Sequence, residues 1–198
     1  RLQLARWLLQ PVHPQTARVM VNRIWLHLFG QAFVSTPDDF GVYGSRPTHP
    51  ELLDHLAERF VAEHWSIKKL IREIVLTRTY QLDSQRDAKL AKADPDNRLF
   101  THHRRRRLDA ESLRDSLMSV AGTLDLSPGE GSAVEQKDVL IDRLPPEEAN
   151  LHRDCHHRSV YLCMLRHAPP AELAAFDLPE FVQVMGKRNE TTLPTQSL

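Results

Sequence analysis

The stretch TARVMVNRIWLHLFG, residues 16–30, decides the first part of the fold. Apolar residues recur in it at the i, i+3, i+4, i+7 spacing of an amphipathic helix, which gives a buried stripe of Ala17, Met20, Val21, Ile24 and Leu28. Gly30 follows directly, and glycine readily takes the left-handed conformation that ends a helix. The sequence therefore predicts a helix over residues 16–29 with one buried face.

Further helices are predicted on both sides of this one. Residues 2–10 carry an apolar helical face that ends at Pro11. Residues 48–51, Thr-His-Pro-Glu, fit a capping box in which the Thr48 hydroxyl accepts a first-turn amide and Glu51 returns to the cap. Two helices follow, over residues 49–63 and 67–78, and their short connection requires that they pack on each other.

The next predicted elements are a turn and a capped helix. The turn is Asp-Pro-Asp-Asn at residues 94–97. Asp109 is the expected N-cap of the helix, and Gly122 closes it. The buried side of this helix is predicted to be Leu113, Leu117, Val120 and Ala121.

The character of the chain changes after residue 122. Short strands are predicted at residues 139–141, 158–165 and 181–185, with a short helix over residues 170–176. The predicted fold class is mainly α: a helical bundle-like body, residues 1–122, and a small α+β C-terminal part, residues 123–198, with two or three short strands. We expect the two parts to pack as one domain. Because the sequence starts at Arg rather than Met, we also expect it to be a piece of a longer protein.

The charge balance argues against nucleic-acid binding. The 198 residues hold 26 Lys+Arg and 26 Asp+Glu, and only 7% are aromatic. The helix pair at residues 49–63 and 67–78 superficially resembles a helix-turn-helix, and the arginine run at residues 104–107 could contact phosphates. Because Asp109 and Glu111 follow the run, a salt-bridged face is the preferred interpretation.

Membrane and disulfide classes are not indicated either. The longest apolar run, residues 160–165, is far shorter than the roughly 18 residues that a membrane span needs, so no span is predicted. The two cysteines, Cys155 and Cys163, are too few for a disulfide framework. Whether they are bonded to each other stays open.

The first candidate site is a polar network around the helix at residues 16–29. The aspartates of Thr-Pro-Asp-Asp at residues 36–39 are adjacent carboxylates, which can share a proton or bind a cation. An ordinary turn is the preferred alternative, with Arg23 pairing with one of the two aspartates to organise the fold. The candidate residues are Asn22, Arg23, His27, Asp38, Asp39 and His49.

The second candidate site is a cluster of metal-ligand types, His152, Asp154, Cys155 and His156, with His157, Cys163 and His167 after it. Imidazole and thiolate suit zinc or copper. An exposed polar loop is the preferred alternative, because the spacing matches no zinc finger. Cys155-His156 resembles the end of a Cys-x-x-Cys-His haem attachment, but His152 occupies the first cysteine's place, so no covalent haem is expected here.

No motif assigns a reaction. There is no Gly-x-Ser-x-Gly elbow, and Asp-Phe-Gly at residues 39–41 lacks the glycine-rich loop and His-Arg-Asp segment of a kinase. We assign no catalytic residues and prefer a non-catalytic interpretation.

Several motifs together resemble the planctomycete-type PSD domain of unknown function, and they cover nearly the whole chain. In order they are ARVMVNRIW (17–25), LFG (28–30), DDFG (38–41), HPELLD (49–54), WSIK (65–68), RRRL (105–108), AE (110–111), RD (114–115) and FD (176–177).

The resemblance implies no established activity. It implies a C-terminal module of large exported bacterial proteins that often carry a cytochrome-c-like domain, and hence an extracytoplasmic location. The partners that it implies are neighbouring domains of the same longer chain, with cytochrome-like domains among them. The leading hypothesis is an accessory interaction or scaffold module, and the alternative is a metal-binding or metal-dependent enzyme domain.

Overall fold

A computed structural model describes residues 1–10, 13–129, 155–164, 170–178, 185–188 and 191. The chain divides into two compact units, Arg1–Arg106 and Arg107–Leu198, each of which is described by itself. The described residues are mainly helical and hold no sheet, which confirms the mainly α prediction. The predicted boundary at residues 122/123 differs from this division, and packing as one domain stays a prediction.

Helix α2, Thr16–Phe29, has the predicted bounds, and Gly30 ends it with a φ of 72°. Its buried residues are Ala17, Val21, Asn22, Ile24, Trp25, Leu26 and Phe29. The buried face is thus rotated from the predicted stripe, and Met20 stays 38% exposed. The rotation follows from the aromatic rings, since Trp25 stacks on Phe29 with ring centroids 4.1 Å apart and sets the face that turns inward.

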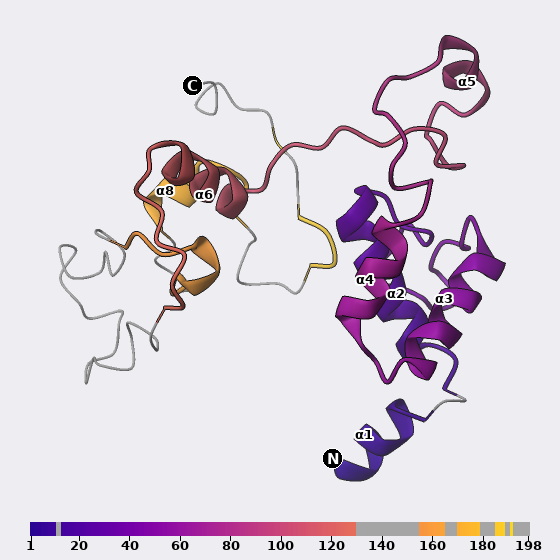
Figure 1. The fold of residues 1–198 in the computed structure, drawn as a ribbon. Helices are drawn as coiled ribbons and strands as arrows, with labels where there is room; N and C mark the ends of the chain where they lie inside the picture. Colours follow the sequence, from indigo (N-terminus) through magenta and orange to yellow (C-terminus); the bar gives the residue numbers. More distant parts are fainter. Residues whose placement is uncertain (11–12, 130–154, 165–169, 179–184, 189–190, 192–198) are drawn as a thin grey trace. The chain divides into compact units, whose positions relative to one another are not determined.

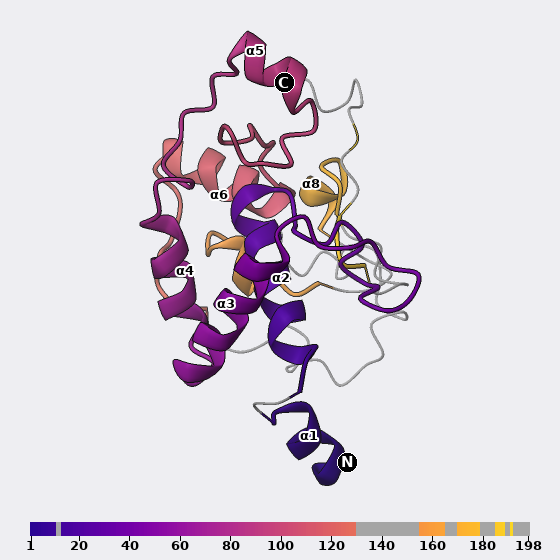
Figure 2. The ribbon, with the colours of Figure 1, turned by 90° about the vertical axis from the view of Figure 1, so that its right-hand side faces the viewer.

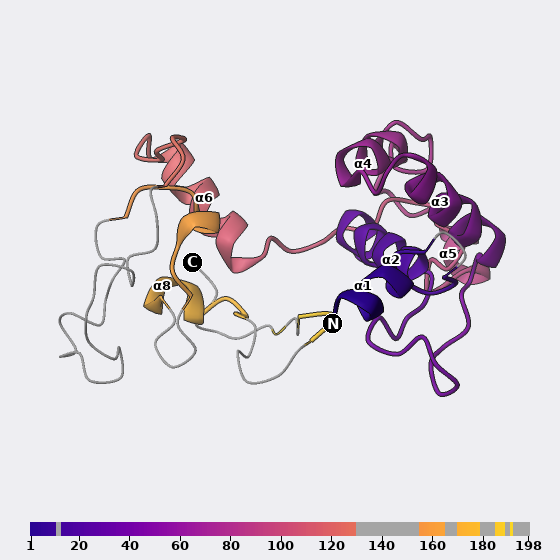
Figure 3. The same ribbon diagram turned by 90° about the horizontal axis from the view of Figure 1, so that it is seen from below.

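Helices α3, Pro50–Ala62, and α4, Ile67–Val75, form the predicted pair and pack on each other, while α3 also packs on α2 (Figures 1 and 3). The turn between them carries His64 and Trp65, both with positive φ. Leu53 and Phe60 of α3 and Ile74 of α4 join the buried core around α2. Burial of these apolar faces is what holds three short helices together.

The capping box predicted for α3 is wrong. The N-cap is His49 rather than Thr48, and its side chain makes no capping hydrogen bond. The Thr48 amide donates to the carbonyl of Phe33 at 3.0 Å, and the Thr48 hydroxyl lies 2.9 Å from His49 Nδ1. The Thr48 hydroxyl therefore contacts the neighbouring His49 ring instead of capping α3.

Helix α1, Leu2–Leu8, buries no residue, and helix α5, Ala88–Ala93, stands apart from α2, α3 and α4 (Figures 1 and 2). The predicted turn after α5 is present, with the Asn97 amide donating to the Asp94 carbonyl at 3.1 Å. The buried Asp94 carboxylate accepts the amides of Arg98 and Leu99, both at 2.8 Å. This folds the chain back so that Phe100 enters the aromatic core.

The second unit is built on α6, Ala110–Val120, which packs on the 3₁₀ helix η2, Ser159–Tyr161, and on α8, Ala171–Ala174 (Figure 1). The predicted cap of α6 is confirmed, because Asp109 accepts the Ser112 amide at 2.8 Å. The predicted C-terminal glycine is also confirmed, since Gly122 has a φ of 71°.

Two predictions for this unit are wrong. The expected buried side of α6 is largely outside, with Leu117 51% and Val120 91% exposed and Ala121 exposed as well, while Leu113 is partly buried and Ala110 is the buried residue. Within the described part of the strand predicted at residues 158–165, Ser159–Tyr161 form η2, and the Ser159 amide bonds to the Asp115 carboxylate rather than to a neighbouring strand. The strand at 139–141 lies outside the described residues, as does all of the strand at 181–185 except Met185.

Candidate functional site

The candidate site is the loop of residues 35–47, which connects the core after α2 to α3. Both of its ends are anchored in the interior. Asn22 of α2 is fully buried, and its Nδ2 donates to the Val34 carbonyl at 3.1 Å while its Oδ1 accepts the Val34 amide at 2.9 Å. At the other end the Thr48 amide donates to the Phe33 carbonyl. The loop therefore starts and ends at one fixed place in the core.

Hydroxyl groups join the two sides of the loop. The Thr36 hydroxyl accepts the Ser45 amide at 2.9 Å and donates to the Asp39 carbonyl at 2.8 Å. The Ser45 hydroxyl accepts both the amide and the hydroxyl of Ser35, each at 2.9 Å. These side-chain hydrogen bonds hold the two sides of the loop together, as backbone hydrogen bonds do in a β-hairpin. They also provide partners for backbone groups of Ser35, Asp39 and Ser45.

The tip of the loop is equally constrained. The Gly41 amide donates to Asp39 Oδ1 at 2.7 Å, and the Gly44 amide donates to the Gly41 carbonyl at 3.1 Å. A Cβ atom at Gly44 would lie only 2.1 Å from the Asp39 carbonyl oxygen, so this close approach of backbone to backbone requires glycine. Two hydrogen bonds and one close backbone approach thus define the path of the tip.

Between the two glycines stand Val42 and Tyr43, whose side chains are 96% and 94% exposed. Neither side chain contributes to the core or to the bonds that hold the loop. An ordered loop that displays an aromatic and a branched apolar residue has the chemistry of an interaction anchor, since burying them against a partner releases water at little cost in conformational entropy. Arg46 of the same loop is exposed.

The predicted polar network is only partly brought together here. Asn22 is the buried polar group, and its partner is the Val34 backbone. Arg23 is exposed, and the ion pairs of the described residues include none between it and Asp38 or Asp39.

The two predicted histidines lie in different surroundings. His27 is exposed, and its carbonyl accepts a bond from Arg106 Nη1 at 2.5 Å. The His49 ring packs against both Phe33 and Phe100, with centroid distances of 6.0 and 5.6 Å. Among the predicted residues, Asn22, Asp39 and His49 thus support the loop or its base, and His27 lies at the end of α2.

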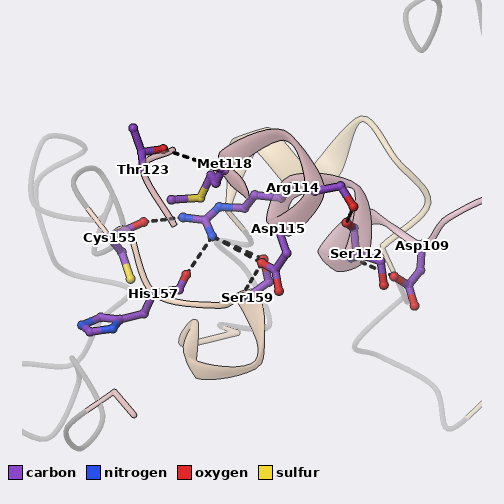
Figure 4. Close-up of polar contacts among 10 residues, drawn as sticks. Asp109, Ser112, Arg114, Asp115, Met118, Thr123, Cys155, His157 and Ser159 are labelled. Atoms are coloured by element: carbon purple, nitrogen blue, oxygen red, sulfur yellow. Dashed lines mark hydrogen bonds and ion pairs between the residues drawn. The ribbon is translucent and has the colours of Figure 1, made fainter. Parts of the chain in front are cut away.

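A second polar cluster lies in the C-terminal unit and centres on Arg114 of α6 (Figure 4). Its guanidinium donates to the carbonyls of Cys155 and of His157, the latter at 3.1 Å, and to the Ser159 hydroxyl at 3.3 Å. Asp115 Oδ1 accepts the amide and the hydroxyl of Ser159, both at 2.7 Å. Adjacent residues of one helix therefore hold the whole backbone segment 155–159.

His157 also meets Asp125 across an isolated parallel bridge. His157 Nδ1 lies 3.4 Å from Asp125 Oδ2, within ion-pair range but without hydrogen-bond geometry. The pKa of Asp125 is lowered, first by the backbone and side-chain hydrogen bonds of Ser127 and then by the nearby histidines.

Two of the four predicted metal ligands can be placed. Cys155 is partly buried and His156 is exposed, on the segment that Arg114 holds. His152 and Asp154 lie outside the described residues. Within the described part of the chain, no three His, Cys, Asp or Glu side chains lie close enough together to hold a metal ion.

The arginine run has internal partners. Arg105 Nε donates to the Ser84 hydroxyl at 3.2 Å, and Arg106 binds the C-terminal turn of α2. Arg107 donates to the Thr191 carbonyl at 2.6 Å and lies 3.7 Å from the Asp177 carboxylate. Three of the four arginines thus contact other residues of the fold, and among the described residues Arg107 is the one of them that lies within ion-pair distance of a carboxylate, that of Asp177.

Sequence reasoning missed Val42, Tyr43 and Arg46. The available signal was Gly-Val-Tyr-Gly at residues 41–44, two apolar residues between glycines inside a turn-rich segment. Two residues between glycines are too few to form a strand or to build a core. A position at the surface, with both side chains exposed to solvent, is the remaining interpretation.

None of the described helices is both long and apolar enough to cross a membrane. Neither the curated proteins nor the solved structures compared with the chain include a match. One family model does match, that of PSD1, protein of unknown function (DUF1553), and it covers residues 1–198. The chain therefore belongs to the PSD1 family of proteins of unknown function.

Proposed function

We propose that this chain is an accessory interaction module of an exported multidomain bacterial protein, and that it makes its contacts through the 35–47 loop. The observation that supports this is the near-complete exposure of Val42 and Tyr43 on a loop fixed by internal hydrogen bonds. The proposed partners are neighbouring domains of the longer chain, including cytochrome-like ones, outside the cytoplasm. The family resemblance supports that setting.

The energetics favour such a role for the loop. Burying a side chain of the size of valine stabilises a complex by about 1.5 kcal/mol or more. Tyrosine is enriched among residues that dominate binding energy, because it has a large rigid surface and a polar end. Since the loop is ordered before binding, little of this gain is lost to ordering it.

The test is binding in trans between residues 1–198 and the remaining domains of the longer protein, measured by isothermal titration calorimetry. The double variant Val42→Ser with Tyr43→Ser should weaken binding at least roughly tenfold. Leu99→Ser is the matched control, because Leu99 is 67% exposed in the same unit but lies outside the loop. Equal binding by the wild type and the double variant, or no binding by either, contradicts the proposal.

A second candidate function is metal binding at His152, Asp154, Cys155 and His156, with zinc or copper as the metal. The supporting observation is that Arg114 holds the carbonyls on both sides of His156, so that the Cys155-His156 pair sits on a fixed backbone. A fixed backbone lowers the entropic cost of gathering ligands. We propose near-stoichiometric metal in protein purified without a histidine tag.

Metal analysis by mass spectrometry tests this second candidate. The double variant Cys155→Ser with His156→Gln should lose the metal, whereas His55→Gln, on the exposed side of α3, should keep it. Wild-type protein that is metal-free and unchanged in thermal stability by added zinc or copper ends the metal hypothesis.

A further inference from the structure

We propose that the exposed segment of residues 104–106, at the end of the N-terminal unit, binds an acidic polypeptide segment of another protein domain. This surface is separate from the 35–47 loop and does not depend on the function proposed for that loop. It ends the basic part of the unit, residues 78–106, which follows α4 and includes α5 (Figures 1 and 2).

The basic part carries a local excess of positive charge although the whole chain is neutral. Residues 78–106 hold eight Lys+Arg against four Asp+Glu, a net charge of +4 in which the negative charges of all four acids are counted. All eight basic residues are exposed, and none lies within ion-pair distance of a carboxylate among the described residues. They are Arg78, Arg86, Lys89, Lys92, Arg98, Arg104, Arg105 and Arg106.

The positive charge is densest at residues 104–106. Arg105 donates to the Ser84 hydroxyl and Arg106 to the His27 carbonyl, so neutral acceptors hold both guanidinium groups without cancelling their charge. The Arg104 side chain has no hydrogen bond or ion pair among the described residues. Each guanidinium has five N–H donors, so all three keep donors for the paired hydrogen bonds that a carboxylate accepts.

The backbone of the same three residues favours a peptide as the ligand. Within the described part of the protein, neither the amides nor the carbonyls of residues 104–106 make a hydrogen bond. The amide just before them, that of His103, donates to the Asp83 carbonyl at 2.9 Å and fixes where the exposed segment begins. An exposed backbone without partners can bind an extended peptide through main-chain hydrogen bonds, while its side chains select the charge of that peptide.

Other anionic partners fit this part less well. Its two aromatic residues other than histidine present no open ring on which bases could stack, because Phe100 is buried and Tyr80 packs edge-on against His103. Its exposed large apolar residues are Leu90 and Leu99, which together bury too little surface for stable attachment to a membrane.

Fluorescence anisotropy with residues 1–198 and fluorescein-labelled poly-L-glutamate tests the proposal. Binding is expected at about 50 mM salt and should weaken as the salt concentration rises, because charges carry the interaction. Arg104→Gln with Arg105→Gln should weaken binding roughly tenfold. The matched control is Lys68→Gln with Arg72→Gln, at exposed positions of α4, which removes the same charge and should weaken binding less than about twofold.

Other polyanions of matched charge distinguish a peptide from other sources of negative charge. Alginate carries carboxylates on a sugar backbone, so it should bind more weakly than polyglutamate if main-chain hydrogen bonds contribute. Mixed-sequence single-stranded DNA and phosphatidylserine vesicles should also bind more weakly. Equal or tighter binding of any of the three overturns the assignment of an acidic polypeptide.

The remaining outcomes test the segment itself. No binding of polyglutamate, or an equal loss in the two double variants, overturns the proposal, since an equal loss is an effect of net charge alone. Both variants should melt as the wild type does, because all four substituted residues are exposed. Val42→Ser with Tyr43→Ser should bind polyglutamate as the wild type does, and a loss in this variant overturns a surface separate from the loop.

Discussion

Asn22 and Val34 are joined by two hydrogen bonds in the interior of the N-terminal unit, with the Asn22 amide group donating to the Val34 carbonyl and accepting from the Val34 amide. Both residues are almost completely buried, with exposures of 0% and 2%. Val34 lies outside any helix, so without Asn22 its two backbone groups would be buried unpaired. One side chain thus closes the base of the displayed loop.

Asn22→Ala should therefore destabilise the protein by about 2–4 kcal/mol, because it leaves a buried donor and a buried acceptor without partners. Urea denaturation followed by circular dichroism measures this change. Arg23→Ala, at the exposed neighbouring position, should stay within about 0.5 kcal/mol of the wild type. Equal stabilities of the two variants would show that water satisfies the Val34 backbone.

The variants Gly44→Ala and Gly122→Ala separate two reasons for a glycine: lack of space for a Cβ atom and a positive φ. The new Cβ at Gly44 meets the Asp39 carbonyl oxygen at 2.1 Å, whereas at Gly122 no atom lies within 4 Å and only the φ of 71° is unfavourable. Gly122→Ala should cost about 1 kcal/mol. Gly44→Ala should shift the amide resonances of the whole loop in an NMR spectrum. An unshifted loop in Gly44→Ala would refute the close backbone approach.

Arg114→Lys should loosen residues 155–159 without unfolding α6. A lysine ammonium cannot span the separate carbonyls of Cys155 and His157 that the guanidinium fork reaches, so about 2 kcal/mol of local stability should be lost. Hydrogen exchange of the Ser159 amide measures the loss. Ser112→Ala, at an exposed position of the same helix, should leave that exchange rate unchanged. Equal exchange rates in the wild type and both variants would show that Arg114 does not hold residues 155–159 in place.

The ion pair between Arg18 and Asp54 predicts a pH dependence. Arg18 Nε lies 2.5 Å from Asp54 Oδ1, and this hydrogen bond lowers the pKa of Asp54. Both side chains are substantially exposed, at 34% and 45%, so the pair is worth at most about 1 kcal/mol. A lowered carboxyl pKa stabilises the fold fully above the unfolded value of about 3.9, and the contribution disappears as the pH falls through the folded value.

Asp54→Asn should therefore be less stable than the wild type near neutral pH and equally stable in strong acid. Urea denaturation of both proteins at about pH 7 and about pH 2 tests this, provided that each still unfolds cooperatively at the lower pH. A stability difference that persists at about pH 2 would assign the effect to packing of the Asp54 side chain rather than to its charge.

The sequence by itself determined the local elements whose causes are local. The bounds of α2, its glycine end, the Asp109 cap and the α3–α4 pair follow from periodicity, cap chemistry and a short connection, and the structure has them. Family membership was also readable, because ordered motifs spread over the chain are more specific than any one of them.

Only the tertiary structure decided which groups pair over long separations. Threonine is a residue type that often caps helices, but the Thr48 amide bonds to the carbonyl of Phe33. No local sequence pattern predicts that contact. The segment at residues 158–165 has strand propensity, yet Asp115 of α6 bonds to the Ser159 amide, and Ser159–Tyr161 form η2. Propensity measures what a segment prefers alone, and a hydrogen bond from a distant residue can outweigh it.

The displayed loop shows the same division. Its glycines, serines and aspartates predict a turn-rich segment. Whether a side chain of this segment is exposed, however, depends on whether another part of the chain packs over it. That Val42 and Tyr43 stay in water while Trp25 and Phe33 are buried depends on where the helices leave room, and only the packed structure fixes this.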